Sequence, residues 1–415
     1  MIDLKRIRFS INNCIDCEKK PCLIGCPLDN DIPTMIKYIK ENDYANAYNT
    51  LLNSTILPSI CGRVCPFDRQ CIGACVKKNQ SDFIEIGYLE SIVGDMAIKN
   101  NYPIPLKEKI GKKVLVVGGG PAGLTCAYFL RKEGVDVDIY EAHNYLGGLL
   151  YHGIPDFRLD KDILNESIKR IINLDINVKY NMKLGKDFLL DEVIDNYDAI
   201  FLGIGANTNI RLNIPGEDLV GVYGGNELLE YRLHPDYANK IAVVNGAGNV
   251  AMDVARTIKR LGAKKVYVIY RRDEDSMPAD KNEVSDAKED GIEFIFQTNV
   301  IKIIGNTNVE KIECVKTELV KNENERPLPV NVEGSNYFID TNYFIEAIGS
   351  TVDMNVLNSL NLELNQNNKI KVSKFHTSNE KVFAAGDVVN NKQTVAFAAR
   401  TGKDAAFEII EYLKK

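Results

Sequence analysis

The chain has 415 residues, of which 45% are apolar, and at roughly 150 residues per domain this length suggests about three domains. Its net charge is -6, and the absence of any run of five or more like charges gives no indication of nucleic acid or an anionic membrane as a partner. The first nine residues lack the apolar core of a signal peptide, and no stretch approaches the ~18 apolar residues of a membrane span, so we expect a cytoplasmic protein.

Eight of the ten cysteines lie in two short runs near the N-terminus. Closely spaced thiolates chelate metal, and in a reducing compartment such a cluster indicates metal before disulfides. Two zinc knuckles of four cysteines each, iron-sulfur clusters and disulfides all fit the number of cysteines. A run that closes on Cys-Pro resembles the bacterial ferredoxin arrangement, although one gap of four residues departs from it. The runs are Cys14-x2-Cys17-x4-Cys22-x3-Cys26-Pro27 and Cys61-x3-Cys65-Pro66-x4-Cys71-x3-Cys75.

The segment between the two runs has a helical pattern. Asp31 is the expected N-cap and Pro33 lies in the first turn. Apolar residues then recur mostly at spacings of three and four, at positions 35, 36, 39, 44, 48, 51 and 52. We therefore predict a small helical domain packed around the metal.

After a linker at 102–105 the pattern changes to short Val/Ile-rich strands that alternate with helices. This alternation predicts parallel sheets with ligands at the strand ends. The isolated Cys126 and Cys314 are expected to be core residues of a helix and a strand. The expected strands are 113–117, 135–140, 199–202, 241–244 and 266–269.

Two copies of one dinucleotide-binding unit follow each other in this region. Each has a glycine turn whose backbone can approach a pyrophosphate, then a helix, over 124–132 in the first copy and 252–260 in the second. The expected contact residues are Gly118, Gly120, Pro121, Ala122 and Gly123 in the first turn, and Gly246, Gly248, Asn249 and Val250 in the second.

The residues that close the second strand of each copy differ in charge. Glu141 suits the ribose hydroxyls of FAD or NAD, whereas Arg271 and Arg272 suit the 2′-phosphate of NADP. The arginine pair could equally be a solvated strand end. Two redox nucleotide sites favour the iron-sulfur interpretation of the cysteines, because a flavin converts a hydride into single electrons for a cluster.

The expected electron path runs from NADPH to FAD, to the clusters and to an outside acceptor. Hydride transfer needs alignment more than an acid or base, so we assign no catalytic side chain. The four histidines, at positions 143, 152, 234 and 376, need no catalytic role. NADH remains an alternative donor, since arginines of this kind do not exclude it.

The whole chain resembles the small subunit of glutamate synthase and its relatives. These relatives are the N-terminal part or small subunit of dihydropyrimidine dehydrogenase and the large subunit of the bifurcating ferredoxin:NADP oxidoreductase. The matching stretches are Cys61-Gly-Arg-Val-Cys-Pro66, Gly147-Gly-Leu-Leu-Tyr-His-Gly-Ile-Pro-Asp-Phe-Arg158, Gly248-Asn-Val-Ala-Met-Asp253, Tyr270-Arg-Arg-Asp-Glu-Asp-Ser-Met-Pro-Ala279, Ala347-Ile-Gly349 and Ala385-Gly-Asp387.

The resemblance implies an α/β fold in which an α-helical iron-sulfur domain precedes two Rossmann-like domains. The NADP domain is inserted in the FAD domain, which is therefore built from two segments of the chain. The implied boundaries are 1–108 for the helical domain, 109–220 and 348–415 for the FAD domain, and 221–347 for the NADP domain.

The resemblance also implies two 4Fe-4S clusters and their ligands. One cluster takes Cys14, Cys17, Cys22 and Cys75, and the other takes Cys26, Cys65, Cys71 and Glu90. Cys61 is then a spare thiol. A hard carboxylate ligand beside three sulfurs would adjust the potential of the second cluster.

Further residues of the cofactor sites follow from the resemblance alone. Arg158 matches an arginine that contacts the flavin, and Asp387 of the Gly386-Asp387 loop matches the residue that holds the ribityl chain. The helix after Thr394 and Val395 is expected to direct its positive end at the flavin ring. The other implied contacts are Gly148 and Leu149 for FAD, and Ala347 and Gly349 for the nicotinamide.

These observations together predict an electron-input subunit that forms a hetero-oligomer with a larger catalytic subunit or another acceptor protein. Three domains leave no room for a glutaminase or an FMN barrel, so the chain cannot make glutamate or reduce a pyrimidine alone. The alternatives are the small subunit of a dihydropyrimidine dehydrogenase, an electron-bifurcating flavin subunit, and a non-catalytic redox-sensing protein.

Overall fold

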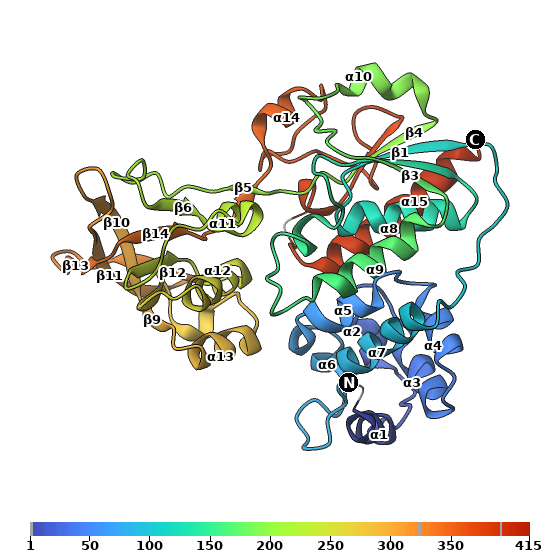
Figure 1. The fold of residues 1–415 in the computed structure, drawn as a ribbon, viewed down its shortest axis with the longest axis horizontal. Helices are drawn as coiled ribbons and strands as arrows, with labels where there is room; N and C mark the ends of the chain where they lie inside the picture. The colour runs from blue at the N-terminus through green and yellow to red at the C-terminus, as the bar shows by residue number, and fades with distance from the viewer. Residues whose placement is uncertain (1–2, 323–324, 391) are drawn as a thin grey trace. The chain divides into compact units, whose positions relative to one another are not determined.

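The computed structural model describes residues 3–322, 325–390 and 392–415. The chain forms two compact units (Figure 1). Unit 1 comprises residues 1–151, 156–206 and 352–415, and unit 2 comprises residues 152–155 and 207–351. Within the described residues, no helix is both long and apolar enough to span a membrane.

The N-terminal part of unit 1 is helical, as predicted. Asp31 caps its third helix by accepting a hydrogen bond from the Thr34 amide at 3.3 Å, which confirms the expected start. The apolar pattern is divided between two helices, because Asn42 has a left-handed φ of 58° and Asp43 caps the next helix. The helices are α1 Leu4–Asn13, α2 Pro21–Gly25, α3 Ile32–Lys40, α4 Tyr44–Leu51, α5 Pro58–Val64, η1 Phe67–Arg69, α6 Cys71–Ala74 and α7 Ile86–Lys99.

The rest of unit 1 is a five-stranded parallel sheet in the order β16-β4-β1-β2-β3. Its edge strand β16 comes from the C-terminal segment of the chain, so two distant segments build one sheet. Figure 1 shows α8, α9 and the long α15 together on one face, with the N-terminal helices packed against this layer. The strands are β1 Lys113–Val117, β2 Asp136–Tyr140, β3 Ile176–Lys179, β4 Ala199–Leu202 and β16 Val382–Ala384, and the main helices are α8 Pro121–Lys132, α9 Lys161–Ile172, α10 Leu190–Val193, α14 Met354–Asn358 and α15 Val395–Leu413.

Unit 2 contains a second five-stranded parallel sheet, in the order β6-β14-β7-β8-β9. Its elements are β6 Val222–Gly224, α11 Gly225–Tyr231, β7 Ile241–Asn245, α12 Asn249–Arg260, β8 Lys265–Tyr270, α13 Lys281–Glu289, β9 Glu293–Phe296 and β14 Tyr343–Glu346. The five strands expected from the sequence are all found in the two sheets, within one or two residues of their predicted ends.

An antiparallel sheet that the sequence analysis did not predict lies between β9 and β14 along the chain. It consists of β10 Thr298–Ile304, β11 Lys311–Asn322, β12 Glu325–Asn331 and β13 Tyr337–Asp340. A short antiparallel pair, β5 Thr208–Asn209 and β15 Ser350–Thr351, closes unit 2 at both of its chain ends. Cys126 in α8 and Cys314 in β11 are fully buried, as expected for core residues.

Both parallel sheets have the same connectivity around the strand that precedes their glycine turn. β1 lies between β2 and β4, and β7 lies between β8 and β14, so the chain reverses its strand order beside β1 and beside β7. In open α/β sheets, ligands bind at the carboxyl ends of the strands at such a reversal. The fold therefore places both glycine turns, which follow β1 and β7, at ligand-binding positions. The proposed domain boundaries at 108, 220 and 347 stay predictions.

Candidate functional site

The glycine turn after β1 is shaped for close approach by a ligand. Gly118 has a φ of 97°, and a Cβ at Gly123 would lie 1.8 Å from the Gly118 carbonyl oxygen, so both positions require glycine. Gly120 is the N-cap of α8 and makes no side-chain cap, and a Cβ there would meet no protein atom within 4 Å. The free amides of the first turn of α8 therefore face open space, as a pyrophosphate requires.

Three other predicted segments of unit 1 converge on this turn. A Cβ at Gly148, in the short helix η2 Gly148–Leu150 that also holds Leu149, would lie 3.1 Å from the Gly120 Cα. A Cβ at Gly386, in η5 Gly386–Val388, would lie 3.1 Å from the Ala122 Cβ. The third segment is α15, because a Cβ at Gly402 would lie 2.2 Å from the Ala122 carbonyl oxygen. Segments that are far apart in sequence thus surround the N-terminus of α8.

Glu141 follows β2 and is only 5% exposed. Its Oε2 accepts the Gly119 amide at 2.8 Å, and its Oε1 accepts the His143 amide at 2.8 Å. A carboxylate has about four acceptor sites, so these two bonds fix the side chain and leave acceptor capacity for ribose hydroxyls. The placement agrees with the adenosine-binding role predicted for Glu141, which stays a prediction.

Asp387 carries a buried polar atom that has no partner in the described residues. Its Oδ1 is fully covered and receives no hydrogen bond, and burial raises the pKa of the Asp387 carboxyl to about 6, while the Lys369 ammonium opposes this shift. Lys369 Nζ donates to the Asp387 carbonyl at 2.9 Å and holds the loop. An orphaned buried acceptor beside a dinucleotide turn fits a hydroxyl-rich ligand such as the ribityl chain of FAD.

The remaining predicted flavin residues are also in unit 1. α15 begins at Val395, and Thr394 caps it by accepting the Phe397 amide at 3.3 Å. Arg158 ends the stretch 147–158 and lies in the loop that precedes α9. The N-terminus of a helix of 19 residues carries a positive partial charge, which suits an electron-accepting ring.

Gly120 and Gly123 allow a direct test of the first glycine turn as a pyrophosphate-binding site. Replacing Gly120 with Ala should leave the melting temperature unchanged, because the new methyl group meets no protein atom. It should lower the affinity for FAD at least about tenfold, or roughly 1.4 kcal/mol, because the methyl group occupies the approach to the helix amides. Replacing Gly123 with Ala should instead destabilise the fold. Full FAD content in the Gly120→Ala protein, measured by absorbance after gel filtration, would contradict pyrophosphate binding at this turn.

The second glycine turn, in unit 2, repeats these features. Gly246 has a φ of 143°, and a Cβ there would lie 2.1 Å from the Ala347 carbonyl oxygen. Gly248 is the N-cap of α12 without a side-chain cap, and a Cβ there would meet nothing within 4 Å. Asn249 Oδ1 accepts the Asp280 amide at 2.9 Å, so this side chain holds the following loop. Val250 lies in the first turn of α12, and Ala347 and Gly349 follow β14 beside the glycine turn.

Arg271 and Arg272 follow β8, where a 2′-phosphate is expected. Arg271 is exposed, and Arg272 is partly buried with its Nε donating to the Pro327 carbonyl at 2.9 Å. Thr317 holds the backbone here by donating from Oγ1 to the Arg271 carbonyl at 2.8 Å. The antiparallel sheet thus supports the arginine pair, a contact between segments that the sequence did not predict.

Four of the eight clustered cysteines line one pocket in the helical part of unit 1. They are Cys14, Cys17, Cys22 and Cys75, the set that the resemblance implies for one cluster. Burial, followed by the neighbouring Cys75 thiol, raises the pKa of Cys22 to about 11. A thiol whose pKa is raised in this way needs a nearby cation before it can become a thiolate at neutral pH. All ten cysteines are free, so the disulfide alternative finds no pairing in the structure.

A second group gathers around Glu90 on α7. Burial and then the Glu90 carboxylate raise the pKa of Cys71, and the same two causes raise that of Cys26 to about 12. For Cys65 the Cys61 thiol, which is hydrogen-bonded to it, is the largest cause, followed by burial. Three thiols and a carboxylate, of which Cys65 is partly buried and the others are buried, correspond to the second implied ligand set. Cys61 also lies here, so its role as a spare thiol stays a prediction.

Small residues bring these two groups together. A Cβ at Gly25 of α2 would lie 2.4 Å from the Ala74 Cβ of α6, so these short helices cross closely. A Cβ at Gly62 of α5 would lie 2.4 Å from the Ser91 amide nitrogen of α7, which brings Glu90 against α5. The second crossing explains how a helix glutamate, unremarkable in the sequence, comes to lie among cysteines.

α15 connects the first glycine turn to the second cysteine group. Lys403 Nζ donates to the Leu28 carbonyl at 2.9 Å, and Arg400 Nη1 donates to the Pro27 carbonyl at 2.9 Å. Both carbonyls belong to the loop that directly follows Cys26. Gly402, which packs against Ala122 of the glycine turn, is adjacent to Lys403, so α15 contacts both sites within one helical turn.

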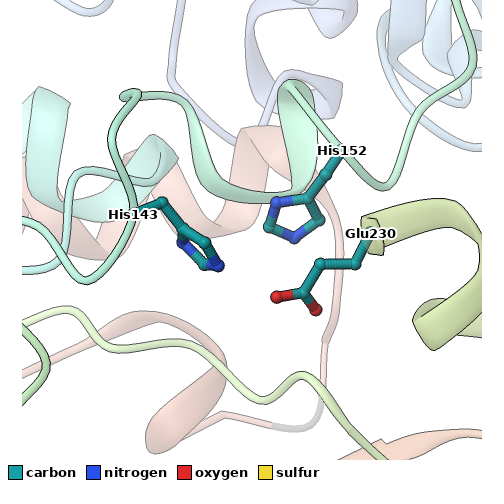
Figure 2. A group of neighbouring side chains, drawn as sticks. All are labelled: His143, His152 and Glu230. Carbon is teal, nitrogen blue, oxygen red and sulfur yellow. The ribbon is translucent and has the colours of Figure 1, made fainter. Parts of the chain in front are cut away.

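His143, His152 and Glu230 come from three separate segments (Figure 2). His143 is in the loop after β2, His152 follows η2 and Glu230 is on α11. His143 belongs to unit 1, whereas His152 and Glu230 belong to unit 2. Within unit 1, the His143 ring stacks on Tyr145 at 5.0 Å, and its Nδ1 lies 3.1 Å from Glu141 Oε1.

Sequence reasoning did not single out three buried polar residues beside these sites. Lys369 supports the Asp387 loop, and Asn30 and Ser54 lie behind Glu90. Asn30 is in the stretch 29–33, where only Asp31 and Pro33 attracted attention as helix-start signals. The available signal was a polar residue three positions after the Cys26-Pro27 pair.

Two protein families match the chain, one over the part with the glycine turns and the other over the part with the clustered cysteines. Residues 112–402 match the pyridine nucleotide-disulphide oxidoreductase family, and residues 5–102 match the family of dihydropyrimidine dehydrogenase domain II, 4Fe-4S cluster. The solved structure of Mycobacterium tuberculosis FprA in complex with NADPH superposes with a TM-score of 0.64 at 20% identity, over 73% of this chain and 85% of that one. Thioredoxin reductase of T. acidophilum gives a TM-score of 0.57 at 18% identity, over 73% and 100%. Both solved structures therefore share the fold of the matched part of this chain.

Curated relatives cover almost the whole sequence. The glutamate synthase [NADPH] small chain of Escherichia coli K12 is 34% identical over 97% of this chain and 90% of its own length. The NADP(+)-dependent formate dehydrogenase subunit beta of Moorella thermoacetica is 33% identical over 95% of this chain and 60% of its own. The NADPH-Fe(3+) oxidoreductase subunit beta of Geobacter sulfurreducens DL-1/KN400 is 35% identical over 84% and 53%.

Proposed function

Because this chain belongs to the family of the glutamate synthase small chains, we propose that it is an electron-input subunit. It oxidises NADPH and passes the electrons through FAD and two 4Fe-4S clusters to a partner protein. The family matches for the nucleotide-binding and the 4Fe-4S parts support these cofactors. The structure adds two open glycine turns, the orphaned oxygen of Asp387 and two groups of buried or partly buried ligand-type side chains that fit them.

The observation that carries this proposal is the path through α15. Gly402 of this helix packs against Ala122 of the first dinucleotide site, and within one turn of it Arg400 and Lys403 hold the loop after Cys26. A buried lysine thus joins the nucleotide site to the cysteine group, as electron transfer between the two requires them to be held close together. Lys403 is buried, and burial lowers the pKa of its ammonium, so its position has a cost in stability that function explains.

Each part of the chain has a definite task in this scheme. The amides at the start of α8 and α12 bind the two pyrophosphates, and Glu141 and Arg271/Arg272 distinguish the adenosine ends. When bound, the flavin supplies the conversion of a hydride's electron pair into single electrons, which the clusters accept one at a time. The positive end of α15 stabilises the negative charge that develops on reduction.

The receiving protein follows from what the relatives are called. The glutamate synthase and formate dehydrogenase relatives are each named as one chain or subunit of a larger enzyme. We therefore propose a hetero-oligomer in which a larger catalytic subunit accepts the electrons, as in glutamate synthase. The pocket with Cys14 and Cys17, which are less buried than Cys22, is the group nearer the surface and the natural exit.

An anaerobic titration tests the proposed function. Addition of NADPH should bleach the flavin absorbance, and further NADPH should reduce the broad absorbance of the clusters. NADH should require a higher concentration for the same bleaching, because it lacks the 2′-phosphate that Arg271 and Arg272 are proposed to bind. No bleaching by either nucleotide in protein that contains FAD would contradict an electron-input role.

A further inference from the structure

A chain of buried hydrogen bonds ends on the Glu90 carboxylate. Ser54 Oγ donates to Asn30 Oδ1 at 2.6 Å, and Asn30 Nδ2 donates to Glu90 Oε1 at 3.0 Å. The exposed fractions of Ser54, Asn30 and Glu90 are 6%, 1% and 5%. Among the described residues, Asn30 is the hydrogen-bond donor to the Glu90 side chain, and Glu90 Oε2 accepts no hydrogen bond. These hydrogen bonds therefore fix Oε1 of the Glu90 carboxylate and leave Oε2 available to a metal.

The direction of this chain follows from the chemistry of its members. A metal-bound Glu90 is ionised, and an ionised carboxylate only accepts hydrogen bonds, so in that form the amide NH2 of Asn30 faces Glu90. The amide oxygen then faces Ser54, whose hydroxyl supplies the donor. The shorter Ser54 contact is the one with Asn30, since the Leu51 carbonyl lies 3.2 Å from the same hydroxyl, and with Glu90 ionised this arrangement satisfies both ends of the Asn30 amide.

The backbone that carries Asn30 is held equally firmly. Asn30 is four residues after Cys26, and Asp29 between them has a left-handed φ of 59°. Lys403 and Arg400 of α15 bind the carbonyls of Leu28 and Pro27 in this loop. One short, clamped loop thus carries both a thiol of the second cysteine group and the amide that holds its carboxylate.

We propose that Asn30 is a positioning residue for the second cluster: it orients Glu90 for iron and raises the reduction potential of that cluster. This inference rests on the proposed function, in which Cys26, Cys65, Cys71 and Glu90 hold a 4Fe-4S cluster. A hydrogen bond to an anionic ligand withdraws electron density from the metal and favours the reduced form. Ser54 acts through Asn30, one step further away.

The test compares Asn30→Leu, which keeps the branched shape and the number of heavy atoms but removes the donor, with Asn46→Leu as a matched control. Asn46 is an exposed asparagine of the same helical domain whose amide also donates to a carboxylate, Asp43 Oδ2, at 2.6 Å. The measurements on the purified full-length protein are iron content and an anaerobic redox titration monitored by EPR, which follows the two clusters separately.

We expect Asn30→Leu to retain its iron and to reduce its second cluster with an equilibrium constant about tenfold smaller, a fall of about 59 mV for one electron. The EPR signal of that cluster should also change shape, whereas the first cluster and the Asn46→Leu protein should match the wild type. Ser54→Ala should show a smaller fall in the same direction. An unchanged potential and signal in an iron-replete Asn30→Leu protein would overturn the proposal.

If Asn30→Leu loses its iron, the Ser54→Ala protein provides the test, because this substitution disturbs the Asn30 amide without removing it. A lowered potential there supports the positioning role, and a wild-type potential means that Asn30 serves the fold alone and overturns the proposal. A wild-type protein without two clusters would instead refute the proposed function, whatever the Asn30 variants do.

Discussion

Replacing Cys65 with Ser is expected to remove about four of roughly eight irons per chain, whereas replacing Cys61 with Ser should leave the iron content unchanged. Cys61 lies in the last turn of α5, and Cys65 is the C-cap of this helix. Both side chains lie near Glu90, so the two variants are closely matched. Only Cys65 belongs to the implied ligand set. Cys65→Ser should also abolish electron transfer to an artificial acceptor that depends on the clusters, while flavin reduction by NADPH continues.

Iron analysis and EPR of the reduced proteins provide the measurement. The reverse result, with iron lost from Cys61→Ser and retained in Cys65→Ser, would refute the ligand assignment and make Cys61 the fourth ligand in place of Glu90. Glu90→Ala provides a cross-check, because a protein that keeps both clusters without this carboxylate would also refute its assignment.

Replacing Arg271 and Arg272 together with Ala should raise the KM for NADPH roughly 10- to 100-fold and leave the KM for NADH nearly unchanged. A hydrogen bond to a charged group contributes about 1.5–3 kcal/mol, and each 1.4 kcal/mol is a factor of ten in affinity. Arg271 is exposed at the end of β8, where a 2′-phosphate would lie, so its charge is available to the ligand.

The control removes the same charge from another part of unit 2. Lys302→Ala/Lys316→Ala changes two exposed lysines of the antiparallel sheet and should alter neither constant. Steady-state kinetics with each nucleotide give the four values. Equal rises in KM for NADPH and NADH in the arginine variant would contradict the phosphate-binding role and indicate a general loss of nucleotide affinity.

Features with a local physical cause could be predicted from the sequence. The two glycine turns appear at Gly118 and Gly246 between a strand and a helix, because positive φ angles and close backbone approach require glycine there. The strands 113–117 and 199–202 were predicted to the residue, since fully apolar runs of this length are typical of buried parallel strands. The cap at Asp31 is equally local.

Features that depend on distant contacts could not be predicted in this way. The antiparallel sheet β10–β13 has exposed and buried faces with many charged residues, and its strands lack a strong apolar signal. The break between α3 and α4 at Asn42 and Asp43 was missed, although Asn with positive φ followed by an N-cap Asp is a recognisable pair. Asn30 became visible only when Glu90 and Ser54 were placed beside it.

The grouping of the cysteines lies between these two cases. The spacing alone indicated metal, but it left zinc and iron-sulfur open, and the division into two sets rested on the family resemblance. The structure brings Cys75 to the first run and Cys26 to the second because α2 and α6 cross at Gly25 and Ala74. Such an exchange between runs depends on how two short helices pack, which no spacing rule contains.

The most direct test of the central claim is the cofactor content of the anaerobically purified protein, measured as iron, zinc and flavin per chain. The account predicts about eight irons and one FAD per chain, with almost no zinc. Zinc without iron, or a protein that binds no flavin, would contradict the path from nucleotide to cluster on which every other prediction depends.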